Sequence, residues 1–153
     1  MATGNSSVRR VTTGDAALWQ AAVRAVVPPE DREHRLATLD DLASAVSDET
    51  CYLYVATIAK LPVGIVTGYR FPDVECGGHI VYLYDIVVAN THRRQGIGVQ
   101  LVNKLVEDCE TDGVRLIWAG TDVANNAARR TFESTEAELE GESYVEYEWD
   151  LED

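Results

Sequence analysis

The spacing of apolar residues changes along the chain, and each change predicts a different element. Residues 14–27 and 39–48 place apolar side chains at helical intervals, which predicts two short helices. Pro28 and Pro29 end the first helix, because proline cannot continue one. Residues 7–13 alternate weakly and predict an opening strand.

From residue 50 onward the pattern is that of β-strands. Residues 50–60 and 61–71 are rich in aromatic and β-branched side chains, and the corner between Lys60 and Pro62 joins them as a hairpin. Residues 79–88 form an almost unbroken apolar run, which is typical of a strand buried on both faces. We therefore expect this run near the centre of a sheet.

The second half of the chain returns to helical spacing and then alternates between element types. A strand meander followed by strand–helix units predicts an α/β protein with a mixed sheet. The expected elements are a helix at 99–113, a strand at 114–122, a short helix at 125–135 and a final strand with period-two alternation at 142–153.

Length and composition agree with one domain over residues 1–153, of which about 1–7 form a polar lead-in. Apolar residues make up 46% of the chain, enough for a core without disulfide or metal cross-links. No apolar run approaches the roughly 18 residues that span a bilayer, so we expect no membrane segment. Three scattered cysteines predict reduced, buried thiols in a cytoplasmic protein, and no metal site.

The formal net charge is -13, and the charges are unevenly distributed. After Arg130 the chain has ten acidic residues and no lysine or arginine. This balance argues against nucleic acid or an anionic membrane surface as a partner. Two interpretations stay open: a solvated acidic surface, for example in a salty cytoplasm, or a negative cleft that attracts a polycationic substrate.

The basic, glycine-rich turn at residues 92–98 predicts an anion site. Backbone N–H groups at a helix start lack intrahelical partners, and the helix dipole favours negative charge there. Gly96 and Gly98 allow close backbone approach, and Arg93 and Arg94 add positive charge. The turn lacks the ending of a Walker A loop and the third glycine of the dinucleotide fingerprint. On its own, the turn favours a phosphate site and a merely tight connection equally.

The wider pattern resembles the GNAT N-acetyltransferases. Arg-x-x-Gly-x-Gly after a strand that ends in Asp-Ile-Val-Val is similar to their acetyl-CoA loop. Their second signature, Asn-x-x-Ala-x-x-x-Tyr, is matched here by Asn125, Ala128 and Phe132. The resemblance covers nearly the whole chain. It implies a mixed sheet whose two central strands splay apart, flanked by helices, with acetyl-CoA as the cofactor.

The resemblance also implies how the chain holds acetyl-CoA. The backbone of Val87 and Val88 is expected to pair with the pantetheine arm, and the amides of 94–99 to hold the pyrophosphate. Asn125 is expected to meet the arm from the other side. The implied cofactor-binding residues are Val87, Val88, Arg93, Arg94, Gln95, Gly96, Ile97, Gly98, Val99, Asn125, Ala128 and Phe132.

Within the family, the sequence resembles the aminoglycoside 3-N-acetyltransferase branch. The resemblance rests on Tyr84–Asp85 before the loop and on Asp122 after the next strand, followed by Asn125 and Asn126. It implies a cationic small-molecule amine as the acceptor. By the same resemblance, the apolar face of the final strand is expected to complete a homodimer.

Acetyl transfer to an amine requires a group that binds the ammonium and removes its proton. Asp85 interrupts an apolar strand, where an unpaired carboxylate costs free energy, and Asp122 closes the next strand. We expect these two catalytic carboxylates to bind the ammonium and accept its proton. The alternatives are a bulge acid bonded to backbone N–H groups for Asp85, and a turn or cap for Asp122. The expected acceptor-binding residues are Tyr84, Asp85, Asp122, Glu146 and Glu148, although a solvated strand face suits the last two.

Two positions depart from the family pattern. Phe132 stands where many relatives have a tyrosine that protonates the leaving thiolate, and phenylalanine has no proton to donate. Either water or another hydroxyl, such as that of Tyr84 or Tyr144, protonates the thiolate, or the thiolate leaves unassisted. Glu136 replaces the usual glycine, so we expect the turn there to differ. These departures leave open a non-catalytic acyl-CoA-binding module. A polyamine, a small amine, or a lysine or N-terminus of a protein also remains an alternative acceptor.

Overall fold

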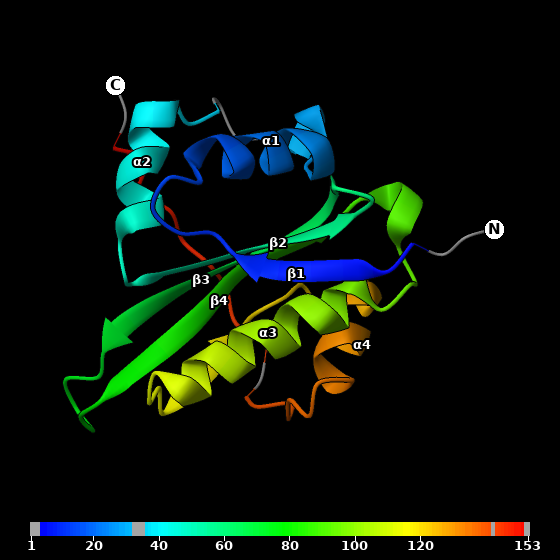
Figure 1. Ribbon diagram of the computed structural model, residues 1–153. Helices are drawn as coiled ribbons and strands as arrows, with labels where there is room; N and C mark the ends of the chain where they lie inside the picture. Colours follow the sequence, from blue (N-terminus) through cyan, green and yellow to red (C-terminus); the bar gives the residue numbers. More distant parts are fainter. Residues whose placement is uncertain (1–3, 32–35, 142, 152–153) are drawn as a thin grey trace.

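A five-stranded open sheet forms the centre of the computed structural model, which describes residues 4–31, 36–141 and 143–151 (Figure 1). The strands lie in the order in which they occur along the chain. The first four are antiparallel, and the fifth is parallel to the fourth, which confirms the expected mixed sheet. They are β1 (Ser6–Arg10), β2 (Cys51–Ile58), β3 (Leu61–Pro72), β4 (His79–Val88) and β5 (Leu116–Ala119).

Helices cover both faces of the sheet (Figure 1). On one face, α1 and α2 pack on a cluster that includes Leu53, Val55 and Ile65. On the other, α3 packs its buried side on Tyr52, Tyr54, Val66 and Val81, and Phe132 of α4 joins this cluster. The helices are α1 (Ala16–Val26), α2 (Leu39–Ser47), α3 (Ile97–Thr111) and α4 (Asn126–Glu133), with short 3-10 turns at Pro29–Asp31 and Asn90–His92.

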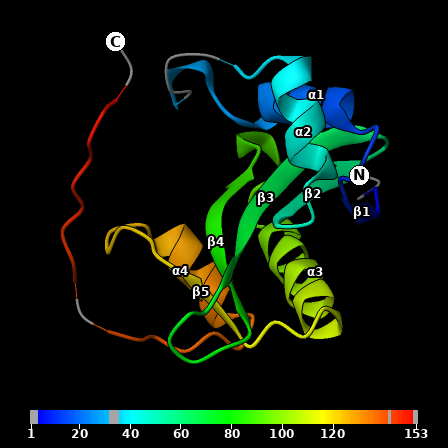
Figure 2. The ribbon, with the colours of Figure 1, turned by 90° about the vertical axis from the view of Figure 1, so that its left-hand side faces the viewer.

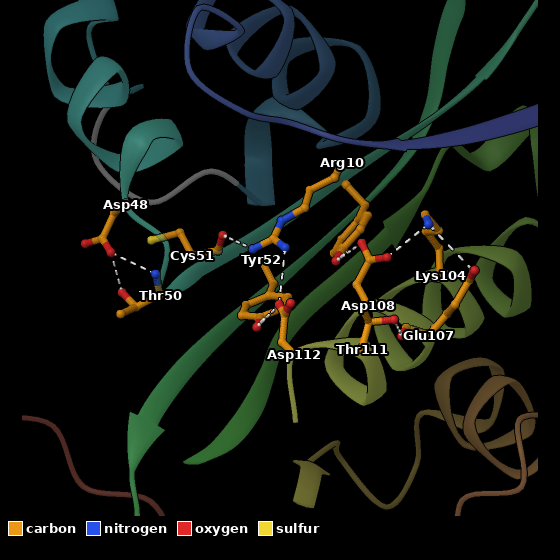
Figure 3. Close-up of polar contacts among 11 residues, drawn as sticks. Arg10, Asp48, Thr50, Cys51, Tyr52, Lys104, Glu107, Asp108, Thr111 and Asp112 are labelled. Atoms are coloured by element: carbon orange, nitrogen blue, oxygen red, sulfur yellow. Dashed lines mark hydrogen bonds and ion pairs between the residues drawn. The ribbon is translucent and has the colours of Figure 1, made fainter. Parts of the chain in front are cut away.

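The C-terminal half of α3 is tied to the sheet by a polar network (Figure 3). The hydroxyl of Tyr52 donates to Asp112 at 2.6 Å, and that of Tyr54 donates to Asp108 at 2.8 Å. Arg10 lies over the Tyr52 ring, 4.1 Å from its centroid, and Lys104 pairs with Asp108 at 3.0 Å. Burial and these hydrogen bonds raise the pKa of Tyr52 to about 12, so both phenols are neutral donors at neutral pH. The network orients the helix whose other end carries the glycine turn.

The predicted final strand is wrong for residues 143–151, and positions 142 and 152–153 lie outside the described residues. Residues 143–151 belong to no strand and run apart from the sheet (Figure 2). Alternation indicates a strand only where a neighbouring strand supplies hydrogen bonds, and within the described chain this segment has no such neighbour.

Two smaller expectations also need correction. Ser6, expected in the polar lead-in, already belongs to β1, where it pairs with Ile58, and the strand expected over residues 7–13 ends at Arg10. Positions 1–3 lie outside the described residues. Cys109 is buried as expected, whereas Cys76 is exposed in the loop before β4. Within the described part of the chain, no helix is long and apolar enough to cross a membrane.

Candidate active site

A gap opens in the sheet where β4 loses one of its two neighbours. Pairing with β3 continues to Val88, which lies opposite Gly64. Pairing with β5 covers only Ile80 to Leu83, the last of which lies opposite Ala119. Along the described chain, the edge of β4 from Asp85 to Val88 that faces β5 therefore has no strand partner. An extended ligand can pair with backbone groups there, as the resemblance implied for Val87 and Val88.

The glycine turn lies directly after this open edge and starts α3. Arg94 and Gly96 both have left-handed backbone conformations, with φ of 62° and 76°. Gly96 occupies the N-cap position, and a Cβ added to it would meet no atom within 4 Å, so the space before the helix is open. No side chain caps the helix, which leaves the first N–H groups of α3 for an anion.

The second signature is explained by local structure. Asn125 is the N-cap of α4, and its Oδ1 accepts a hydrogen bond from the Ala128 N–H at 3.1 Å. The Asn-x-x-Ala spacing is thus a capping spacing, which leaves the side-chain amide of Asn125 to meet a ligand. A Cβ on Gly98 would lie 3.2 Å from Thr131, so this glycine allows α3 and α4 to approach closely. Phe132 packs against the core beside α3.

Asp85 follows a β-bulge on the face of the sheet that carries α1 and α2. The register pairs Thr67 with Asp85 but Gly68 with Leu83, so Tyr84 is the extra residue. Desolvation raises the pKa of the Asp85 carboxyl although the residue keeps solvent access, and a hydrogen bond from the Ile86 N–H partly opposes this rise. The structure thus contains the bulge and backbone bond of the alternative interpretation. It also contains what a base needs, a solvent-reachable carboxylate with a raised pKa.

An aromatic cluster adjoins Asp85, and the sequence analysis identified only one of its members as functional. Tyr82 stacks on Trp118 with ring centroids 5.0 Å apart, and Tyr84 packs edge-on against both Tyr69 and Tyr82. The pKa of the Tyr69 hydroxyl is raised by burial and, to a smaller extent, by the nearby negative charge of Asp85. Tyr84 and Trp118 remain accessible. The sequence shows aromatic residues at positions 82, 84 and 118. Only the pairing of the strands shows that these residues lie together on one face of the sheet.

Asp122 has a different role from Asp85. Its Oδ1 accepts a hydrogen bond from the Ala124 N–H at 2.7 Å, and its backbone carbonyl accepts one from the Asn125 N–H. This is the turn that the alternative interpretation described, and it leads the chain from β5 into α4. Asp122 is exposed. The structure therefore explains the residue without catalysis.

Glu146 and Glu148 lie on the segment 143–151. The negative charge of Glu146 raises the pKa of Tyr144, to which Tyr82 also contributes. The Tyr144 hydroxyl lies so close to Gly120 that an added Cβ would be only 2.4 Å away. Glu146 is thus connected to the sheet through Tyr144, while Glu148 is exposed further along the segment.

The arrangement fits a long anionic cofactor. The turn offers free N–H groups with Arg93 and Arg94 beside it, and the open edge of β4 leads from the turn to Asp85. Arg93 donates from its Nε to the Val88 carbonyl at 3.4 Å, which keeps the arginine at this edge. In the described ranges, no group of three or more His, Cys, Asp or Glu is placed to hold a metal ion. A cavity of about 500 Å³ between Arg10, Cys51 and Arg70 lies at the far end of α3, near Asp112, and is separate from this site.

Comparison with known families agrees with this geometry. The profile of the acetyltransferase (GNAT) family matches residues 16–135, which includes every element from α1 to α4. No curated protein matches the chain closely enough to show a relationship.

Solved structures share the fold over nearly the whole chain. The aminoglycoside acetyltransferase meta-AAC0020 from an uncultured soil metagenomic sample, in complex with sisomicin, has a TM-score of 0.86 at 21% identity, covering 96% of this chain and 97% of that one. The aminoglycoside N-acetyltransferase AAC(6')-Iy in complex with CoA has a TM-score of 0.72 at 16% identity, covering 95% of each chain. A ribosomal-protein-alanine N-acetyltransferase from Brucella melitensis biovar Abortus 2308 has a TM-score of 0.68 at 20% identity, covering 94% of this chain and 99% of that one. At these identities the likeness establishes the fold.

Proposed function

The chain belongs to the acetyltransferase (GNAT) family, and from this premise we propose that it transfers the acetyl group of acetyl-CoA to an amine of a cationic small molecule. An aminoglycoside is the first candidate, with its 3-N amine as the first position. The complex of meta-AAC0020 with sisomicin supports the substrate class. The choice of the 3-N amine rests on the sequence resemblance alone. AAC(6')-Iy shares the same fold, so the fold does not decide which amine is acetylated.

The observation that carries the proposal is the end of β4–β5 pairing at Leu83 and Ala119, followed by Asp85 and then the glycine turn. When bound, acetyl-CoA supplies a thioester as the acetyl donor. The amides of residues 94–99 bind its pyrophosphate, and the backbone of Val87 and Val88 pairs with its pantetheine arm. Gln95, Asn125 and Ala128 complete this side of the site. The gap then admits the reacting end to the face that bears Asp85.

Asp85 is the proposed general base. The acceptor amine arrives as an ammonium ion, and the Asp85 carboxylate attracts it and takes a proton, directly or through one water. Because desolvation raises the pKa of Asp85, its carboxylate is a stronger base than an ordinary aspartate, and this narrows the gap to the pKa of the amine. Asp122 is the second candidate for the general base. Because its carboxylate already accepts a hydrogen bond from the Ala124 N–H, we expect its substitution to lower the rate less than that of Asp85.

Tyr84 is the proposed proton donor to the leaving thiolate. Phe132 has no hydroxyl and packs against the core, whereas Tyr84 is 61% exposed and adjoins Asp85. The exposed rings of Tyr84 and Trp118 also offer faces that attract ammonium groups through cation–π contacts. Glu146 and Glu148 are also predicted to attract the cationic acceptor with their negative charges.

The test is thiol release from acetyl-CoA with three acceptors: a gentamicin-type aminoglycoside, spermidine and a lysine peptide. We expect turnover with the aminoglycoside. Asp85→Asn is expected to lower kcat/KM by about 10²–10⁴-fold, the usual range for loss of a general base. Glu75→Gln, in the exposed loop before β4, is the matched control and should leave the rate unchanged.

Each part of the proposal has its own contrary result. Turnover only with spermidine or the peptide would overturn the acceptor class while keeping the acetyl transfer. Full activity of Asp85→Asn would remove Asp85 as the base. An Asp122→Asn variant that loses as much as Asp85→Asn would show that both carboxylates act. Full activity of Tyr84→Phe would assign the final protonation to water or Tyr144.

A further inference from the structure

A cavity of about 500 Å³ lies at the end of α3 away from the glycine turn, and its volume is in the range of small-molecule sites. Its walls come from the ends of β1, β3 and α2 and from the start of β2. Asp112, the C-cap of α3, also lines it, whereas Gly96 is the N-cap of that helix. The 15 residues between these caps span about 22 Å, so the cavity is distinct from the proposed active site.

Arg70 of β3 brings a positive charge without a protein partner to this cavity. It lies two residues after Gly68, on the face of the strand that carries α3, and its backbone N–H donates to the Thr50 carbonyl at 2.8 Å. Among the described residues, its side chain joins no ion pair, and its Nε is buried without a hydrogen-bond partner. A buried charged donor costs free energy unless an acceptor pairs with it, so this guanidinium favours an anionic ligand.

Arg10 adds a second guanidinium, which its neighbours hold in place (Figure 3). It lies over the Tyr52 ring, donates from Nη2 to the Cys51 carbonyl at 3.3 Å, and lies 3.6 Å from the Asp112 carboxylate. Asp112 in turn accepts the hydrogen bond of the Tyr52 hydroxyl, so its charge is already matched within the protein. These contacts use few of the five N–H donors of Arg10, and the others remain for a ligand.

The two arginines act on the same buried group. Burial raises the pKa of the Cys109 thiol to about 12, and the positive charges of Arg10 and Arg70 both oppose this rise. Both guanidinium groups therefore lie around one point of the cavity wall. Guanidinium groups match the paired oxygens of a carboxylate, so this part of the cavity suits a carboxylate.

Two exposed carboxylates, those of Asp48 and Glu49, lie at the rim of the cavity. The Oδ1 of Asp48 accepts hydrogen bonds from the Thr50 N–H at 2.8 Å and from its hydroxyl at 2.7 Å, which hold this carboxylate in place (Figure 3). The two rim charges balance the two arginines. A purely anionic ligand therefore gains little net attraction, whereas a ligand with an ammonium group beside its carboxylate meets both signs of charge.

We propose that this cavity binds a free α-amino acid with an apolar side chain such as that of leucine. The ligand carboxylate pairs with the two arginines, and its ammonium group pairs with the two rim carboxylates. Its side chain lies against Val11 and Val46, buried residues that form an apolar part of the wall.

The test is titration calorimetry of the full chain with free leucine, for which we expect a dissociation constant below about 1 mM. Isocaproate is leucine without the ammonium group, and isoamylamine is leucine without the carboxylate. Each should bind at least about tenfold more weakly, because each leaves one pair of charges unmatched. No binding of leucine, or isocaproate that binds as tightly as leucine, would overturn the proposal.

Substitutions locate the site. Arg70→Gln should weaken leucine binding at least about tenfold. Arg9→Gln is the matched control, because Arg9 lies on β1 outside the cavity and pairs with Asp15, and it should leave the affinity unchanged. Asp85→Asn should also leave it unchanged, since Asp85 belongs to the proposed active site. Leucine binding that is lost in Asp85→Asn and kept in Arg70→Gln would assign leucine to the amine-acceptor site and overturn the proposal.

Two further measurements do not depend on the stability of Arg70→Gln. The double variant Asp48→Asn and Glu49→Gln changes only exposed side chains, and it should weaken leucine binding and strengthen isocaproate binding severalfold; the opposite order would contradict the role of the rim. In the unaltered protein, the nuclear magnetic resonance signal of the Arg70 Nε–H should shift when leucine is added, and an unchanged signal would overturn the proposal. Both readouts are independent of acetyl transfer.

Discussion

At the scale of single residues, Asp85 is placed where it costs stability. Desolvation raises its pKa above the ordinary value of 3.8, so the folded protein binds this proton more tightly than the unfolded chain. Stability is therefore lost as pH rises from 3.8 through the raised pKa. Asp85→Asn lacks this loss, and we expect its unfolding temperature to exceed that of the unaltered protein at pH 7. Thermal unfolding from pH 4 to pH 7 checks this, because the difference should shrink towards pH 4. A variant that is less stable at pH 7 would show that the carboxylate is fully compensated.

Glu136 is strained. Glu136, which stands where relatives have glycine, has a left-handed backbone conformation with φ of 63°. This conformation costs a non-glycine residue about 1–2 kcal/mol, whereas glycine adds about 0.5–1 kcal/mol of entropy loss. Glu136→Gly should therefore stabilise the protein by up to about 1 kcal/mol in urea unfolding. Ala127→Gly, inside α4, is the control and should destabilise it by about 1 kcal/mol; equal effects of both would contradict the account.

Residue types were easier to predict from the sequence than residue roles. Asp85 is recognisable because a carboxylate interrupts an apolar run. The capping bonds of Asp122 and Asn125 are local, yet the sequence does not distinguish them from a ligand role. The stacking of Trp118 on Tyr82 could not be predicted, because it depends on the pairing of strands that are far apart in the sequence.

At the scale of elements, α3 links the cofactor turn to the sheet. Gly64 of β3 lies beneath its first turns, and an added Cβ would be 3.0 Å from Leu101, 3.1 Å from Ile97 and 3.3 Å from the Val87 carbonyl. In Gly64→Ala, the added methyl group presses on the side chains of Ile97 and Leu101 in α3 and on the Val87 carbonyl at the open edge of β4, and these groups must shift by a few tenths of an ångström. We expect a loss of about 1–3 kcal/mol of stability, typical of overpacking, and severalfold weaker CoA binding by calorimetry.

Gly68 is the matched control for this prediction. It also faces α3, but further along the helix from the glycine turn. A Cβ added to Gly68 would lie 3.3 Å from Val81 and 3.4 Å from Leu105. Gly68→Ala should cost less stability and leave CoA affinity unchanged. Equal losses of CoA affinity in both variants would contradict the placement of the cofactor at this end of α3.

The helices and apolar strands with strong periodicity were predicted correctly, and the final strand expected over residues 143–151 was not. Helical spacing follows from burial within the chain, which explains the agreement for α1 and α3. The bounds of β4 also agree, but its expected burial on both faces is wrong, because only Val81 and Leu83 are buried. Period-two alternation at residues 143–151 describes how a strand would be buried, but no strand among the described residues pairs with this segment. The parallel pairing of β5 and its early end at Ala119 are likewise long-range features.

At the scale of the whole molecule, the net charge of -13 predicts that binding of a cationic acceptor depends on salt. Attraction between a negative protein and a cation is screened by salt, with a Debye length of about 10 Å at 0.1 M. We expect the KM of the aminoglycoside to rise severalfold between about 20 and 200 mM salt, with kcat little changed. An unchanged KM, with stability that collapses at low salt, would favour acidity as an adaptation to high salt.

The central claim is acetyl transfer to an aminoglycoside at the gap between β4 and β5. Its most direct test is nuclear magnetic resonance of the product formed from acetyl-CoA and a gentamicin-type aminoglycoside. We expect one acetyl group, on the 3-amine, and far less of this product with Asp85→Asn. Acetylation at another amine would correct the position, and the absence of any acetylated product, with CoA binding intact, would contradict the claim.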